Sequence, residues 1–225
     1  MKKRLSLLLC LCFLLGCFSV PALADGDGTV TIEPGTVVTF GNFYTDLTDQ
    51  KNPIEWIVYK IEENGCAYLV SRYALAGGIY DTYGGMHAQP RGWNVSVVRS
   101  WLGYDFFNMA FSEEERMYLR PITVHDIRSI DVADYVTLPT SLDALILKSR
   151  LGLDAPVCAP TAYAERFAPA DPVTGNCKWW VRNTEMKKGT ANYFDESGKE
   201  KGTITSTEGI GIRPMILLDL SALAG

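Results

Sequence analysis

Three short motifs of this chain place tryptophan or proline beside an arginine within an apolar stretch. The motifs cover residues 93–102, 178–182 and 211–215, and their arginines are Arg99, Arg182 and Arg213. Arginine is rarely buried without a partner, so these positions predict either fixed ion pairs or a pocket for an anion or a carboxylate-bearing ligand. We expect the structural role, with partners such as Glu55, Asp105 or backbone carbonyls, and the ligand-binding role stays open.

Aromatic side chains lie in and around the same motifs and could form a recognition surface. Tryptophan and tyrosine combine a large apolar face with a polar tip, which suits stacking on a sugar or contact with a protein. Trp101 shares a helical face with Val98 and Leu102, so we expect it in the core together with one of Trp179 and Trp180. Trp93, beside a long loop, is the better surface candidate. The candidate ligand-binding residues are Tyr80, Tyr83, Trp93, Arg99, Trp180, Arg182 and Arg213.

The residues that could support catalysis or metal binding form weaker patterns. His87 lies in a Gly-rich loop and His125 precedes Asp126, but no Gly-x-Ser-x-Gly nucleophile motif occurs in the chain. Asp126, Asp131 and Asp134 could offer oxygens to calcium, yet they lack the order of an EF-hand loop. We therefore assign no catalytic residue, no metal site and no cofactor, and we expect a protein that is not an enzyme. A hydrolase whose site is assembled only in space is the alternative.

The first 24 residues predict a targeting segment. Lys2, Lys3 and Arg4 precede an apolar run over residues 5–20, and Ala22-Leu23-Ala24 offers a cleavage site. Removal of residues 1–24 would leave residues 25–225 as one domain, secreted or held at the cell surface, with no membrane span. The alternative is a lipoprotein, because Leu14-Leu15-Gly16-Cys17 resembles the box in which Cys17 is lipidated.

Charge and cysteine content narrow the classes of partner. The chain carries a net charge of −5. All charged residues of the targeting segment are basic, so residues 25–225 are more acidic than the whole chain. This argues against nucleic acid and anionic membrane surfaces as partners. Cys158 and Cys177 bracket a Pro-, Ala- and Gly-rich loop and could form a disulfide in an exported protein, although free thiols are nearly as well supported. Cys66 falls in a strand pattern and is expected to be a buried thiol.

The elements that must position these residues are short strands and short helices in irregular order. Asn64-Gly65 between two β-rich runs is a strong hairpin signal, and residues 72–92 form a long Gly- and Tyr-rich loop. The expected strands cover 36–40, with Gly41-Asn42 as a break, then 54–61, 67–71, 136–138, 179–182, 191–194, 202–205 and 212–220. The expected helices cover 96–102, 113–119, 142–148 and 161–167, and their caps are Asn94 or Ser96, Ser112, Ser141 and Thr161. This order indicates an α+β fold rather than repeated βαβ units.

A series of motifs along nearly the whole mature chain matches a known family in order. They lie at residues 41–44, 53–56, 69–75, 93–102, 106–112, 138–143, 161–164, 179–182 and 211–214. By these motifs the chain resembles the bacterial domain-of-unknown-function family 6273, which is common in exported proteins of anaerobic Gram-positive bacteria. The resemblance implies a C-type-lectin-like fold, similar to the cores of sulfatase-modifying enzymes and of bacterial surface-binding domains. It implies no biochemical role.

This chain lacks the residues on which the activities of the better-known relatives of this fold depend. Trp93-Asn94-Val95 lacks the acidic ligand of the calcium- and sugar-binding lectin strand, and Cys158 and Cys177 are not the closely spaced cysteine pair of the sulfatase-modifying oxidases. We therefore expect an exported, non-catalytic binding domain for a glycan or a surface protein, with its ligand under the 72–92 loop near Trp93. A purely structural envelope protein is a further alternative.

Overall fold

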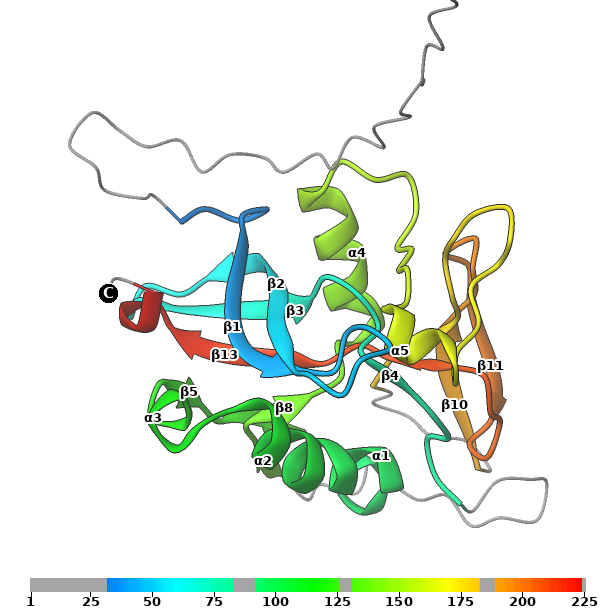
Figure 1. Cartoon of the computed structure of the whole chain (residues 1–225), viewed down its shortest axis with the longest axis horizontal. Helices are drawn as coiled ribbons and strands as arrows, with labels where there is room; N and C mark the ends of the chain where they lie inside the picture. The colour runs from blue at the N-terminus through cyan, green and yellow to red at the C-terminus, as the bar shows by residue number, and fades with distance from the viewer. Residues whose placement is uncertain (1–31, 83–91, 126–130, 183–188, 224–225) are drawn as a thin grey trace, which may run out of the picture.

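The computed structural model describes residues 32–82, 92–125, 131–182 and 189–223 (Figure 1). The predicted targeting segment, with its alternative lipidation site at Cys17, lies outside the described residues. So do Tyr83, His87 and Asp126. Within the part of the chain that the structure describes, no helix is both long and apolar enough to cross a membrane.

The first sheet joins strands from both ends of the chain. It has the order β1 (Val37–Phe43), β2 (Asn52–Ile61), β3 (Cys66–Ser71), β13 (Met215–Asp219) and β5 (Leu119–Arg120), and β8 (Val136–Thr137) also pairs with β13. All these pairings are antiparallel, and the β2–β3 hairpin with its turn at Gly65 is confirmed. The sheet curls into a half-barrel around the core.

The β1 strand is longer than the sequence predicts. It runs through the expected break at Gly41 and Asn42, because a bulge between Thr39 and Asn42 absorbs the irregularity. Gly41 adopts a φ of 68°, a conformation that glycine takes at little cost.

The second sheet positions the Trp179-Trp180 motif. Its order is β11 (Glu200–Ile204), β10 (Thr190–Phe194), β9 (Trp179–Trp180), β12 (Gly211–Ile212) and β4 (Ala76–Gly77). The β10–β11 hairpin is confirmed, and only β12 and β9 pair in parallel among the registers of this sheet. A two-stranded ribbon of β6 (Ile122–Val124) and β7 (Val132–Asp134) completes the described strands.

The predicted final strand is two strands in different sheets. β12 belongs to the second sheet and β13 to the first, with Arg213-Pro214 between them. Proline has no N–H for a ladder hydrogen bond, so the chain changes sheets at this point. The buried Arg213 donates from Nε to the carbonyl of Ser71 at 2.9 Å, which ties the crossing to the end of β3.

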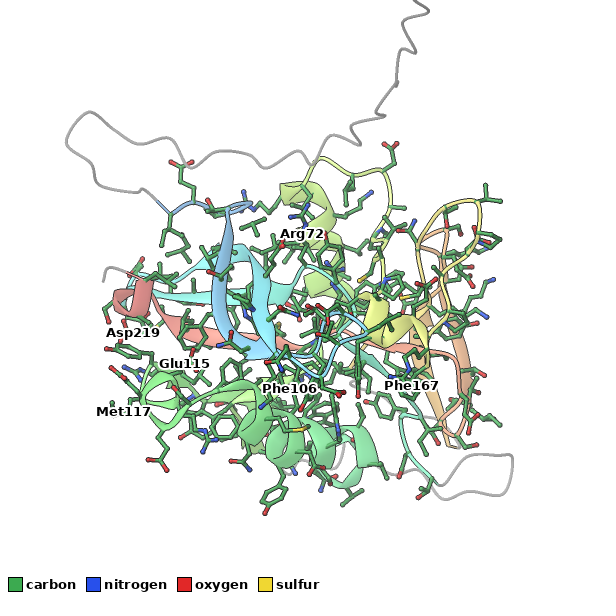
Figure 2. The ribbon with its side chains drawn as sticks, in the orientation of Figure 1. Arg72, Phe106, Glu115, Met117, Phe167 and Asp219 are labelled. Atoms are coloured by element: carbon green, nitrogen blue, oxygen red, sulfur yellow. The ribbon has the colours of Figure 1, made fainter. Side chains whose placement is uncertain are left out.

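A helical segment over residues 97–110 lies against the first sheet and is longer than the predicted helix. It consists of α1 (Val97–Ser100), a π-helical stretch (Trp101–Phe106) and α2 (Phe107–Ala110), preceded by a 3₁₀ turn at Trp93–Val95. The Ser96 side chain caps α1 by accepting from the backbone N–H of Arg99. Figure 2 shows the buried Phe106 between this segment and the sheet.

The remaining helices are short. They are α3 (Glu113–Arg116), α4 (Ser141–Arg150), α5 (Ala162–Glu165) and a 3₁₀ turn (Leu220–Leu223). The capping box of Ser112 and Glu115 and the Thr161 cap are confirmed. The predicted Ser141 cap is wrong, because Thr140 accepts from the backbone N–H of Asp143 and Ser141 is already helical. In Figure 1, α4 lies on the side of the first sheet opposite the 97–110 segment.

Two buried clusters form the core. The larger one joins both sides of the first sheet to the 97–110 segment, α4 and part of the second sheet, and it includes Trp56, Phe106 and Trp180. The smaller one lies beneath the second sheet and holds Trp179 and Phe194 together with both Cys158 and Cys177. The two adjacent tryptophans of β9 thus enter different clusters, as strand alternation requires. The predicted α+β class with mainly antiparallel strands is confirmed.

Candidate functional site

The prediction that Trp93 lies at the surface is wrong. Its side chain is only 1% exposed, and its indole N–H donates to Asp134 Oδ2 at 2.6 Å. The cause is Asp134 at the end of β7, a buried carboxylate that offers the indole a partner inside the protein. A buried tryptophan whose N–H is satisfied in this way serves packing rather than recognition.

Three of the candidate residues form one packed aromatic group. Tyr80 is buried between the rings of Trp93 and Trp180, with centroid distances of 6.2 and 5.5 Å and edge-on geometry. Trp180 donates its indole N–H to the carbonyl of Gly78 at 2.8 Å. The structure therefore brings Tyr80, Trp93 and Trp180 together, but inside the core.

Arg99 has a structural role, with a partner that the sequence did not indicate. Its guanidinium lies 2.7 Å from Asp134 Oδ1, and Nε adds a bond of 2.9 Å to the same carboxylate. The suggested partner Glu55 instead pairs with Arg72 at 2.6 Å. Asp134 thus fixes the indole of Trp93 and the guanidinium of Arg99 at once.

Arg182 and Arg213 are buried and use backbone carbonyls as acceptors. Arg182 donates from Nε to Leu138 at 3.3 Å, and burial lowers its pKa while the carboxylate of Asp143 partly offsets this. Arg213 donates to the carbonyls of Ser71 and Arg72, and its guanidinium lies 5.0 Å from the ring centroid of Trp179. These contacts support the structural reading of both arginines.

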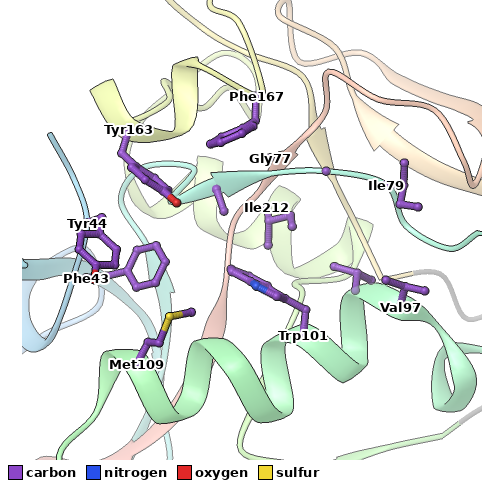
Figure 3. A pocket seen from close by; sticks show the side chains of 13 residues that line it. Phe43, Tyr44, Gly77, Ile79, Val97, Trp101, Met109, Tyr163, Phe167 and Ile212 are labelled. Carbon is purple, nitrogen blue, oxygen red and sulfur yellow. The ribbon is translucent and has the colours of Figure 1, made fainter. Parts of the chain in front are cut away.

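The strongest candidate site is an aromatic-walled cavity of about 320 Å³ (Figure 3). Segments far apart in the sequence meet around it: the end of β1, β4 with the two residues after it, the 97–110 segment, α5 and β12. We call it the aromatic cavity. Its lining residues are Phe43, Tyr44, Ala76, Gly77, Gly78, Ile79, Val97, Val98, Trp101, Met109, Tyr163, Phe167 and Ile212.

The aromatic side chains that line the cavity pack against one another. Trp101 is half-buried and meets Phe43 edge-on at 6.4 Å, so the prediction that it belongs to the core is correct for one side of its ring. Tyr163 packs on Phe43 and Tyr44 at 6.0 and 5.6 Å, and the 45% exposed Phe167 packs on Tyr163. Because these rings pack on one another, their conformations are restricted before a ligand binds, and binding costs little side-chain entropy.

Gly77 allows the cavity to form. A Cβ at this position would lie 2.8 Å from the backbone carbon of Phe167 and 2.9 Å from the Cβ of Ala168. Glycine therefore permits the end of α5 to approach β4, and this approach holds Phe167 at the cavity.

A second hollow of about 390 Å³ adjoins the aromatic cavity and shares Tyr44 and Tyr163 with it. We call it the polar shelf, and its other residues are Asp46, Leu47, Thr48, Asp49 and Arg166. Asp46 accepts from the backbone N–H of Thr48 at 2.8 Å and from Asn52 at 3.0 Å. Hydrogen bonds from the side chain and backbone of Thr48 lower the pKa of Asp46, so it is charged at neutral pH.

The residues considered for catalysis lie away from this cavity. His125 Nδ1 is 2.8 Å from Asp131, but both side chains are well exposed on the surface. Asp134, considered as a calcium ligand, is engaged by Trp93 and Arg99. Among the described residues, no group of three or more His, Cys, Asp or Glu side chains could hold a metal ion.

Most residues of the aromatic cavity were missed by the sequence analysis. Tyr44, Met109, Tyr163 and Phe167 belong to segments that show no shared pattern in the sequence. Tyr44, Met109 and Tyr163 do fall in the motifs at 41–44, 106–112 and 161–164, but nothing in the sequence shows that these motifs meet. A further signal was Gly77-Gly78, which lies in the loop under which we expected the ligand. The cavity does lie beside the described part of that loop, and Trp93 is not among its lining residues.

Comparison with protein-family models, with curated proteins and with solved structures gives no match for this chain. The site is therefore interpreted from its own geometry.

Proposed function

We propose that the chain is an exported, non-catalytic binding domain that recognises a protein segment at the cell surface through the aromatic cavity. The supporting observation is a preformed hollow of about 320 Å³ with walls of half-buried aromatic rings. Concave, apolar and largely preformed sites of this size are typical of ligand binding. The occupant would be an apolar side chain presented by the partner protein.

The lining favours an apolar side chain over a sugar ring. Aliphatic and aromatic carbon dominates the residues around the cavity, and the side-chain hydrogen-bonding groups among them are two tyrosine hydroxyls and the Trp101 indole. A sugar carries several hydroxyls that each need a partner when buried. The partner protein therefore fits better than the glycan of the earlier expectation.

The polar shelf suggests what should flank the apolar side chain. Asp46 and Asp49 place two carboxylates there against one guanidinium, Arg166, and the whole chain carries a net charge of −5. Arg166 also lies over the rings of Tyr163 and Phe167, at 5.8 and 5.5 Å. A lysine or arginine of the partner, next to its apolar side chain, would complement this shelf.

The finer fold assignment belongs to the same proposal. We propose a C-type-lectin-like arrangement, as the family resemblance implies. It is supported by the return of the last strand, β13, to the middle of the N-terminal sheet beside β3, and by the loop-rich second sheet inserted between them in sequence.

Selection from a random peptide library against the immobilised full chain tests the proposed function. A parallel panel of cell-wall and host glycans, with calcium and with chelator, tests the alternative ligand. We expect enriched peptides that share a large apolar residue next to lysine or arginine. The absence of such peptides, or binding to sugars alone, would overturn the proposal.

A matched pair of variants tests whether the peptide binds in the aromatic cavity. Val97 lines the cavity and is 38% exposed, whereas Val95 is 43% exposed and lies outside it. Val97→Asp puts a carboxylate at the cavity mouth in the first turn of α1, where the helix dipole tolerates it. We expect at least a tenfold loss of peptide affinity, about 1.4 kcal/mol, and no more than a twofold change in Val95→Asp.

A second pair of variants each removes one aromatic side chain, and the two side chains belong to equally exposed residues. Phe167 and Tyr135 are each 45% exposed, but only Phe167 lines the cavity. Phe167→Ala should weaken peptide binding and Tyr135→Ala should not. Equal effects in both pairs would show that binding occurs elsewhere.

A further inference from the structure

Two of the three described cysteines lie side by side in the smaller core cluster. Cys158 and Cys177 are 3% and 0% exposed, and the backbone N–H of Cys177 donates to the carbonyl of Cys158 at 2.8 Å. The two thiols also interact with each other, and this interaction shifts the pKa of each. They are free thiols in this structure.

The backbone contact gives the pair a separation that suits a disulfide. With standard backbone bond lengths, a 2.8 Å bond from the N–H of Cys177 to the carbonyl oxygen of Cys158 keeps the two Cα atoms within about 6.7 Å of each other. Disulfides span Cα separations of about 4.4–6.8 Å, so no large backbone movement is needed. Both side chains enter the smaller core cluster, so they lie on the same side of this backbone contact.

The surroundings of the pair distinguish the two sulfurs. Cys158 lies near the buried guanidinium of Arg213, and both residues donate to the carbonyl of Arg72. Burial raises the pKa of Cys158, but the hydrogen bond from Cys177 and the charge of Arg213 outweigh it and lower the pKa to about 7. The hydrogen bond to Cys158, and then burial, raise the pKa of Cys177.

We propose that Cys158 and Cys177 are an oxidisable pair that forms a disulfide in the exported protein. Cys66 has a different setting: it begins β3, where it is paired with Asp219. The pair closes a loop that contains α5, which carries Tyr163 into the wall of the aromatic cavity. The proposal stands without the proposed function, because its test needs no ligand.

The reaction is an exchange with an external disulfide, either oxidised glutathione or the disulfide of a thiol oxidase. The Cys158 thiolate attacks one sulfur of that disulfide, and the other sulfur leaves as a thiolate. Cys177 then gives its proton to the departing thiolate, and its sulfur attacks Cys158 Sγ and expels the second external thiolate. The chain loses two electrons and two protons, and one external disulfide becomes two thiols.

Burial requires that the pair be reached during folding or through local opening. The segment between the two cysteines is mostly exposed from Glu165 to Gly175, so it can separate from the core without unfolding the first sheet. Oxidation should therefore be slow in buffer and faster in mild urea.

The test uses the full chain with Cys10, Cys12, Cys17 and Cys66 replaced by serine, so that Cys158 and Cys177 are the two cysteines that remain. This protein is incubated with oxidised glutathione in about 1–2 M urea. After free thiols are blocked, peptide mapping by mass spectrometry should show the 158–177 linkage and a loss of two hydrogens. Two blocked, unlinked cysteines after prolonged oxidation would overturn the proposal, as would glutathione adducts that never resolve.

A thermal melt provides a second readout. A disulfide that closes a loop of this length should raise the apparent Tm by about 6–12 °C, and a reductant should reverse the rise. The parent chain, with Cys66 present, should give the same 158–177 peptide. A linkage from Cys66 to either of the other two cysteines would contradict the assignment.

Discussion

Asp134 joins two residues that the sequence analysis singled out for other reasons. It accepts from the Trp93 indole at 2.6 Å and pairs with Arg99 at 2.7 Å, and its own side chain is 6% exposed. A carboxylate in this position gives the buried indole N–H an acceptor and the half-buried guanidinium a counter-charge.

Asp134→Ala should lower the free energy of unfolding by about 3 kcal/mol, because it leaves the buried indole N–H of Trp93 unpaired and removes the carboxylate partner of Arg99. Arg99 keeps its bond to the carbonyl of Asn94. Urea denaturation followed by tryptophan fluorescence measures the change. Asp131→Ala is the matched control, since Asp131 pairs with His125 on the surface and should change stability by less than about 0.5 kcal/mol. Similar losses in both variants would refute the role given to Asp134.

Single residues show where sequence reasoning reached its limit. The unusual positions of Arg99, Arg182 and Arg213 were recognised because the residue type and its apolar neighbours are local. Backbone carbonyls were among the expected acceptors, but the particular residues were not recognised, because Asp134 follows Arg99 by 35 residues and Ser71 precedes Arg213 by 142. The burial of Trp93 was missed for the same reason, because its acceptor Asp134 lies 41 residues further along the chain.

Among the elements, the β1 bulge shows how one glycine sets the docking of a helix on a strand. A Cβ on Gly41 would lie 2.7 Å from the carbonyl oxygen of Ala110 and from the ring of Phe111. The backbone N–H of Gly41 also donates to the Glu115 carboxylate at 3.2 Å. The bulge thus brings β1 against the end of α2.

Gly41→Ala should destabilise the protein by about 2–4 kcal/mol, the sum of a left-handed backbone penalty and a steric clash. Gly65→Ala separates the two effects, because Gly65 also has a positive φ but a Cβ there would meet nothing within 4 Å. We expect a loss of about 1 kcal/mol at Gly65, measured by urea denaturation. Equal losses at the two positions would mean that the contact with Ala110 and Phe111 has no cost.

The β10–β11 hairpin depends on one buried carboxylate in its turn. Asp195 pairs with Lys201 at 2.7 Å and accepts from Ser197 and from the backbone N–H of Lys199. Burial raises its pKa, but the hydrogen bonds from Lys201, Ser197 and Lys199 outweigh it and hold the pKa below the usual range.

This pKa shift predicts a pH dependence. A carboxyl group whose pKa is lower in the folded state stabilises the fold above its unfolded pKa of about 3.9, and the benefit is lost as the pH falls through the folded value. Asp195→Asn should therefore cost about 2 kcal/mol at pH 6 and clearly less at pH 2–3, as measured by urea denaturation. A cost that does not vary with pH would contradict this assignment.

The elements confirmed from sequence are those with local signals. Both hairpins and the Ser112 capping box depend on residues within a few positions of each other. The helix after Ser96 was predicted too short because it continues through Gly103, a poor helix former, and is held by packing of Phe106 and Ala110 on the sheet. The crossing between sheets at Arg213-Pro214 also follows from tertiary contacts.

At the scale of the whole molecule, the aromatic cavity is a product of the fold alone. Its walls come from segments between Phe43 and Ile212, which meet only when both sheets, α5 and the 97–110 segment are in place. No local pattern in the sequence predicts such convergence. The sequence therefore indicated a site at Trp93, whereas the structure has its candidate site at the aromatic cavity. The cavity lies beside the described part of the Gly-rich loop because Gly77 permits the close approach of α5, and the ligand expected under that loop stays a prediction.

The indole N–H groups offer a direct probe of the central claim that the aromatic cavity binds the ligand. Trp56, Trp93, Trp179 and Trp180 are buried, and each donates its indole N–H to a fixed acceptor inside the protein. Trp101 lines the cavity. The decisive measurement is a ¹⁵N-indole NMR titration of the full chain with a peptide enriched in the library selection. We predict that the Trp101 resonance shifts in a saturable way, while those of Trp56, Trp93 and Trp179, whose acceptors lie outside the cavity lining, stay in place. Saturable binding that leaves Trp101 unchanged would contradict the account.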